Sequence, residues 1–207
     1  MSDTLFGVVF GLAAGLMPGP LLALVIQQTL RHGPGEGIKV AAAPLLTDLP
    51  IVAAALFALN RLADADGVLG AISLLGAAFL GHLAYESVTT DLAAHAGPAT
   101  TPRSLQKGVA ANLLNPHPYL FWLTVGAPIL WHAWATSPVN AAGFLVAMYG
   151  CLVGSKMLVA LLVGRGRTVL TSRAYVLLVR ALGVLLLVFA LRFLRDGLRY
   201  FGVEGGA

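Results

Sequence analysis

Charged side chains are scarce in this chain of 207 residues. Lysine and arginine number 13 together and aspartate and glutamate 9, so that charged residues make up 11% of the sequence. Soluble domains typically carry about 25%, and they need a charged surface to remain dispersed. The composition therefore excludes a soluble single domain. Hydrophobic residues make up 58% of the chain, enough for about six helices of roughly 20 residues that cross a lipid bilayer.

Cysteine and clustered metal ligands are also scarce. Cys151 is the single cysteine, which excludes an internal disulfide, a Cys-x-x-Cys redox pair and a thiolate metal site. The five histidines are dispersed, and no nucleophile lies beside a base in an arrangement typical of an enzyme. We therefore expect no metal and no other cofactor. A metal-ion exporter of similar architecture and an integral-membrane enzyme are kept as alternative functions.

Six hydrophobic runs, separated by polar or Gly/Pro-rich connectors, predict six helices. The connectors are too short to hold an extramembrane domain, so residues 1–207 are expected to form one transmembrane domain. A cleaved signal peptide is not expected, because no basic segment precedes the first run. The runs cover residues 5–30, 40–60, 68–88, 108–130, 139–163 and 175–195.

Lysine and arginine predict the orientation of these helices. Basic residues concentrate in cytoplasmic loops, and the first, third and fifth connectors carry most of them, whereas the second and fourth carry only Arg61. Both termini are then expected outside, although Arg192, Arg195 and Arg199 near the end of the sixth run favour the opposite. The net charge of +4 accordingly reports topology and does not indicate a nucleic-acid partner. The basic residues of the odd-numbered connectors are Arg31, Lys39, Arg103, Lys107, Arg165, Arg167 and Arg173.

The first and fourth runs are interrupted by the same motif. Pro18-Gly19-Pro20 and Pro116-His117-Pro118 both place Pro-x-Pro inside an apolar run. A proline inside a helix removes a hydrogen bond and clashes with the preceding turn, so both helices are expected to be broken, although one such motif alone can be a packing kink. Matching interruptions in two halves of a transporter indicate its binding site. The prediction is an all-α integral membrane protein, built as a 3+3 inverted repeat with halves of about 1–98 and 99–207.

A broken membrane helix exposes backbone groups that suit a small zwitterion. New half-helices are expected to begin just after Pro20 and Pro118, with N–H groups that favour a carboxylate. The carbonyl groups before the breaks, at residues 14–16 and 112–114, can accept hydrogen bonds from an ammonium group. These groups predict a small amphoteric solute as the ligand.

Two charged residues lie deep in the runs, where ionisable side chains are costly and usually functional. Asp48 lies about 12 Å of helical rise from the cytoplasmic end of the second helix, and Lys156 about 10 Å from that of the fifth. The two can form an ion pair, and Asp48 is the predicted proton carrier. The alternatives are a purely structural pair for Asp48 and, for Lys156, a side chain that extends to the interface.

Polar residues of the fourth run complete the predicted site. Asn112 and Asn115 share one helical face at i, i+3 spacing, and they either bind the solute or cap the broken end. His117 can change charge near neutral pH, or it serves only as a hydrogen-bonding residue. Asp48 is the predicted proton-coupling residue, and the predicted substrate-binding residues are Pro18, Gly19, Pro20, Asn112, Asn115, Pro116, His117 and Lys156.

Four motifs, in order and over nearly the whole chain, resemble the LysE/RhtB family of amino-acid exporters. The lysine usual after Asn-Pro in that family is His117 here, Pro118 is an additional proline, and Pro44 and Thr47 replace small residues near the aspartate. The resemblance implies efflux of amino acids or related metabolites, driven by protons, from a bacterial inner membrane, and it implies a homodimer. The four motifs are Pro18-Gly19-Pro20, residues 31–37 leading to Asp48, residues 75–81, and Lys107-Gly108 through Asn112 to Asn115-Pro116.

Overall fold

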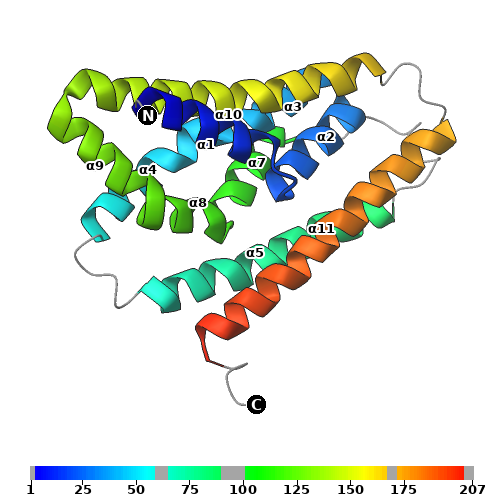
Figure 1. Ribbon diagram of the computed structural model, residues 1–207. Coiled ribbons are helices and arrows are strands. Elements are labelled where there is room, and N and C mark those ends of the chain that lie inside the picture. Colours follow the sequence, from blue (N-terminus) through cyan, green and yellow to red (C-terminus); the bar gives the residue numbers. More distant parts are fainter. Residues whose placement is uncertain (1–2, 59–64, 90–100, 167–171, 203–207) are drawn as a thin grey trace.

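The computed structural model describes residues 3–58, 65–89, 101–166 and 172–202, and these ranges are almost entirely helical (Figure 1). Where they are described, the six hydrophobic runs are helical except at residues 17–19, 42 and 114–115, so the predicted all-α class is confirmed for the described residues. The elements are α1 (Asp3–Leu16), α2 (Pro20–His32), α3 (Pro34–Ala41), α4 (Ala43–Ala58), α5 (Ala65–Val88), α7 (Ser104–Leu113), α8 (Pro116–Phe121), the π-helix η2 (Trp122–Gly126), α9 (Ala127–Thr136), α10 (Pro138–Gly166) and α11 (Ser172–Tyr200).

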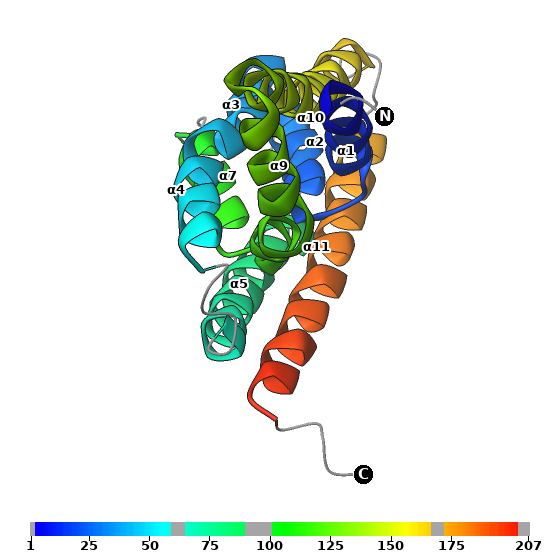
Figure 2. The same cartoon turned by 60° about the vertical axis from the view of Figure 1, so that its left-hand side comes forward.

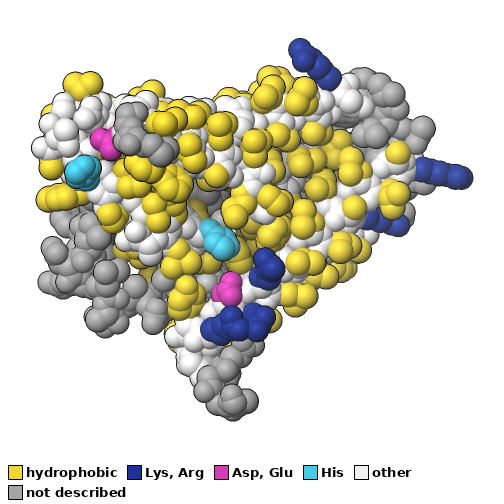
Figure 3. Space-filling view, viewed as in Figure 1, with side chains coloured by type: hydrophobic (Ala, Val, Ile, Leu, Met, Phe, Trp, Pro, Cys, Tyr) yellow, Lys and Arg dark blue, Asp and Glu magenta, His cyan; other side chains and the backbone are white. Residues whose placement is uncertain are grey.

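Several of these helices are suited to a bilayer. Within the described residues, Gly70–Val88, Pro138–Gly166 and Val176–Tyr200 are each long and apolar enough to cross a membrane, and α1 with α2 forms a further candidate, bent by 59°. Many of their leucine and valine side chains are exposed, and hydrophobic side chains cover most of the face shown in Figure 3. Such a surface is typical of contact with lipid tails. The chain is therefore an integral membrane protein that is helical throughout the described ranges apart from short turns.

Two long helix pairs form opposite sides of the molecule. α1 lies along α10, and α5 lies along α11. Figure 1 shows α10 and α11 close together at the C-terminal end of α10 and far apart at their other ends, and in Figure 2 the C-terminal end of α11 likewise lies far from α10. α2 packs against both long helices of the fold, α10 and α11. The described helices thus form a wedge.

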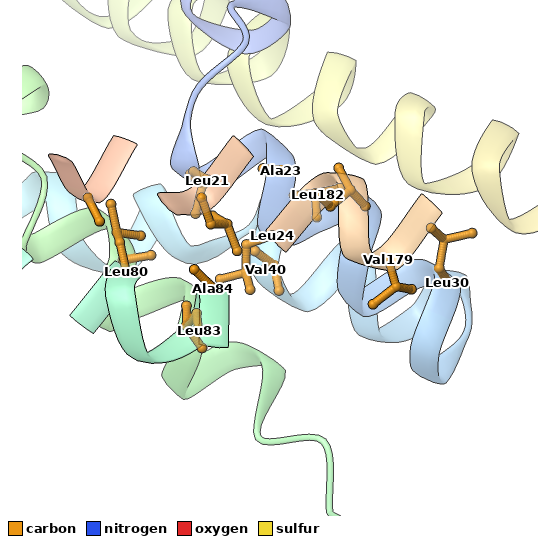
Figure 4. Close-up of a cluster of buried hydrophobic side chains, with 14 of the residues drawn as sticks. Leu21, Ala23, Leu24, Leu30, Val40, Leu80, Leu83, Ala84, Val179 and Leu182 are labelled. Carbon is orange, nitrogen blue, oxygen red and sulfur yellow. The ribbon is translucent and has the colours of Figure 1, made fainter. Parts of the chain in front are cut away.

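The narrow part of the wedge is filled by the larger hydrophobic cluster. In Figure 4, leucines of α2 face Leu80 and Leu83 of α5 and Leu182 of α11. Leu24 and Leu30 of α2 have no exposed surface. A second cluster joins α4, η2, α9 and α10 around Trp122 and Phe144, whose rings are 6.5 Å apart. Aromatic side chains bury large areas in such clusters, and together the two clusters hold the broken helices between the long ones.

Basic residues predicted to be cytoplasmic gather at one place on α5. Lys107 pairs with the Glu86 carboxylate at 3.3 Å, and Arg31 donates to the Glu86 carbonyl oxygen at 3.1 Å. These contacts join α2 and α7 to the C-terminal end of α5. Arg61 and Arg167 lie outside the described residues, so the predicted orientation remains a prediction.

Candidate functional site

Both Pro-x-Pro motifs interrupt their helices. α1 ends at Leu16, and α2 begins at Pro20 after Gly19, which is extended with φ −152° and ψ 176°. α7 ends at Leu113, and α8 begins at Pro116. The start of α2 thus agrees with the prediction to within one residue, whereas the predicted start just after Pro118 is wrong, because α8 begins two residues earlier. A proline fits the first turn of a helix, where its missing N–H group would have no partner, so both helices begin at a proline, and Pro118 lies within the first turn of α8.

Asn115 caps the start of α8. Its backbone is extended, with φ −98° and ψ 121°, and its side-chain oxygen accepts a hydrogen bond of 3.0 Å from the backbone N–H of His117. This is the capping role that the sequence left open for Asn115. The prediction that Asn112 and Asn115 share one helical face is wrong, because α7 ends between them.

Replacing Asn115 with alanine is expected to lower the free energy of unfolding by about 1 kcal/mol, the usual effect of losing such a cap. Alanine has no side-chain oxygen, so the N–H of His117 loses its acceptor. The measurement is the thermal unfolding midpoint of the purified protein in detergent. Asn115→Ser, which keeps an acceptor of the right type, is the matched control and should unfold near the wild-type midpoint. Equal midpoints for all three proteins would contradict the role of the cap.

Lys156 binds the broken end of the first helix. Its ammonium Nζ donates to the carbonyl oxygens of Ala14 at 2.8 Å and Gly15 at 2.9 Å, and the residue is only 4% exposed. The last carbonyls of a helix lack intrahelical partners and carry partial negative charge. The sequence predicted that these carbonyls accept hydrogen bonds from the ammonium group of a solute. In the structure they accept them from the ammonium group of Lys156. An extension of this side chain to the interface is therefore wrong.

Asp48 is held by uncharged side chains from α7, from α10 and from its own helix, α4. The Asp48 carboxylate accepts three hydrogen bonds: 2.7 Å from Asn112 Nδ2, 3.2 Å from the Tyr149 hydroxyl and 3.3 Å from Thr47 Oγ1. The residue is 4% exposed. No ion pair within the described ranges joins Asp48 to Lys156, so the predicted direct pair is wrong. The ammonium of Lys156 lies on the carbonyls of α1 instead, although the two charges still attract each other electrostatically.

The two breaks and the buried charges line one cavity. Its volume is about 570 Å³, within the range of about 300–1,000 Å³ typical of small-molecule sites. Of the predicted substrate-binding residues, all but Pro116 line it, and so does Asp48. The structure therefore brings together residues from α2, α4, α7, α8 and α10 that are far apart in the sequence. The predicted residues in the lining are Pro18, Gly19, Pro20, Asp48, Asn112, Asn115, His117 and Lys156.

The sequence analysis missed several residues of this site. Tyr149 contacts Asp48, and it precedes Lys156 by two helical turns on α10, a spacing that places both on one face and that could have revealed it. Arg192 of α11 also lines the cavity, whereas the sequence assigned it only to the topology. Among the described residues, no group of three or more His, Cys, Asp or Glu side chains is placed to hold a metal ion.

Apolar helices, two of which are broken beside a solute-sized cavity, are typical of membrane proteins that transport small molecules. The sequence profile of the LysE type translocator family matches residues 12–197. The chain therefore belongs to the LysE type translocator family, whose members are transporters and not enzymes, and the predicted family is confirmed. No curated protein and no solved structure matches the chain significantly.

Proposed function

We propose that the protein exports amino acids or related small zwitterionic metabolites across a bacterial inner membrane in exchange for protons. The observation that carries the proposal is the shared cavity, in which both broken helices meet a buried carboxylate. Ionisable residues inside a membrane usually mark a solute or proton pathway. Asp48 is the acidic side chain of this lining, so it is the proposed proton carrier.

The polar groups of the cavity suit the two ends of a zwitterion. The start of α2 has no side-chain cap, and residues Pro20, Leu21 and Leu22 of its first turn line the cavity. Free N–H groups at a helix start favour a carboxylate. Lys156 already occupies the carbonyls of Ala14 and Gly15, so Asp48 is the acceptor that a substrate ammonium group can reach.

The proposal includes six membrane spans arranged as a 3+3 inverted repeat. The first half would contain α1 with α2, α3 with α4, and α5, and the second would contain α7 to α9, α10 and α11. Two features support it: each proposed half begins with a helix broken at a proline, and both breaks line the same cavity. The proposed boundary near residues 98 and 99 lies outside the described residues.

Efflux from living cells tests the proposal. Cells loaded with basic, hydroxylated or branched-chain amino acids by dipeptide feeding should release at least one of them faster when they express the protein than when they carry an empty vector. A protonophore should remove that difference, because it dissipates the driving force. Equal efflux of every amino acid tested, together with a fall in cellular metal content on expression, would favour the metal-exporter alternative.

A further inference from the structure

Arg192 is a charged residue of the cavity that has no role so far. It belongs to the apolar segment Val176–Tyr200 of α11, and its side chain is accessible and lines the cavity together with His117 and Pro20. An arginine within a membrane span is costly and is usually retained for function. Figure 3 shows basic, acidic and histidine side chains gathered where α11 passes the start of α8, on a face that is otherwise mostly apolar.

The guanidinium group of Arg192 is available to a ligand. Lys156, the other basic residue of the lining, donates to the carbonyls of α1. Within the described part of the chain, Arg192 makes no ion pair. Asp196 follows it by one helical turn, and both lie within electrostatic range of His117. The carboxylate of Asp196 is therefore near enough to moderate the positive charge but does not neutralise Arg192 by direct contact.

The position of Arg192 brings it toward the start of α2. α11 packs against α2, and Leu21, in the first turn of α2, belongs to the same buried cluster as Ala190 and Phe193 of α11. His117, at the start of α8, lies 6.0 Å from Phe193 between ring centroids. The starts of α2 and α8 and Arg192 thus line the cavity together, and Asp48 enters the same cavity from α4.

We propose that Arg192 binds the carboxylate of the exported solute and so selects substrates that carry one. The proposal rests on the proposed function, because it names the group that recognises one end of the zwitterion. The guanidinium group presents a planar pair of N–H donors that matches a carboxylate in a bidentate pair. The uncapped N–H groups of α2 reinforce this preference for an anion. Asp48 receives the ammonium group at the other end of the solute.

Pairs of substrates that differ only in the carboxylate test this role. Proteoliposomes containing the purified protein are assayed by counterflow with leucine, threonine and lysine and with the amide of each, which keeps the ammonium group and lacks the carboxylate. The wild type should prefer the acid to its amide. Arg192→Gln should raise the KM for the acid by about tenfold to a hundredfold, the effect of losing a charged hydrogen-bonded pair, with little change for the amide.

Two further variants separate recognition from structure. Arg192→Lys keeps the charge without the planar fork and should give an intermediate ratio of acid to amide. Arg195→Gln removes a neighbouring charge of α11 that does not line the cavity and should leave the ratio unchanged. Arg192 is not the carboxylate-binding residue if both Arg192→Gln and Arg192→Lys keep the wild-type preference for the acid over its amide. The same conclusion follows if both variants lower transport of the acid and of the amide by the same factor. If the wild type transports none of the three amino acids, the proposed function is wrong, and the proposed role of Arg192, which rests on it, is wrong as well.

Discussion

Replacing Asp48 with asparagine is expected to reduce proton-driven export to the level of cells that lack the protein, while the protein still folds. The asparagine oxygen can accept from Asn112 and Thr47 as the carboxylate does, and its NH₂ group can donate to the Tyr149 hydroxyl oxygen. What the variant loses is the ability to bind and release a proton. The measurement is efflux from dipeptide-loaded cells, with and without a protonophore.

Tyr149→Phe is the matched control for Asp48→Asn. It removes the hydrogen bond of 3.2 Å to the carboxylate but keeps the titratable group, so export should persist and should remain sensitive to the protonophore. Both variants must reach the membrane in wild-type amounts, which immunoblotting establishes. If Asp48→Asn exports as fast as the wild type and keeps the same sensitivity to the protonophore, proton coupling through Asp48 is wrong.

The broken helices could be predicted from the sequence because their cause is local. A proline disturbs the helix in which it lies regardless of what packs around it, so the two motifs were sufficient to place the breaks. The start of α8 was misplaced because the prediction treated both prolines as breakers. Asn115 caps the helix and Pro116 occupies its first position, where a proline is favoured.

The hydrogen bonds of Asp48 could not be predicted in the same way, although spacing alone could have placed Tyr149 on the same face of α10 as Lys156. Asp48 and Lys156 lie at similar depths, but depth along a helix does not determine the direction in which a side chain points. The contacts depend on how α4, α7 and α10 cross, which is a property of packing between distant segments. As these helices pack, Asn112 and Tyr149 donate hydrogen bonds to the Asp48 carboxylate, and Lys156 donates to the carbonyls at the end of α1.

Arg192 shows a similar limit. A basic residue near the end of a hydrophobic run is typical of a helix that reaches the interface, and the sequence alone gives no reason to place it in a cavity. The wedge between α11 and the broken helices provides that reason, because it brings the last third of α11 beside the start of α2. Arg192 lies at the end of the sixth helix that the predicted orientation places outside, where basic residues are not expected. A role in the cavity would explain why an arginine is found there.

A larger side chain in the contact between α1 and α10 is expected to destabilise the protein strongly, because the face of α1 that packs against α10 is a row of glycines. Gly7, Gly11 and Gly15 are buried at successive i, i+4 positions, a spacing typical of closely packed membrane helices that the sequence analysis did not use. A Cβ atom on Gly11 would lie 2.3 Å from the carbonyl oxygen of Met148 and 2.9 Å from Cys151 Cβ. The obstacle at Gly11 includes backbone, so a change of side-chain rotamer cannot remove it.

Gly11→Leu is therefore expected to separate α1 from α10 and to lower the free energy of unfolding by about 3 kcal/mol or more, at or above the upper end of the usual effect of overpacking. Little folded protein should accumulate, since that is a large part of the total stability of a typical domain. The measurements are the amount of monodisperse protein after extraction and its thermal unfolding midpoint. Gly11→Ala should show a smaller loss in the same direction.

Gly150→Leu on α10 provides the matched control for the glycine row. A Cβ atom there would meet nothing within 4 Å, and the position is exposed, so the added side chain should lie against lipid and leave both measurements near wild type. If Gly11→Leu and Gly150→Leu lower the amount of folded protein and the unfolding midpoint equally, the effect comes from any bulky residue in these helices, and the prediction for Gly11 is wrong. A loss confined to Gly11 would instead establish the close backbone contact, on which the position of Lys156 against the broken end of α1 depends.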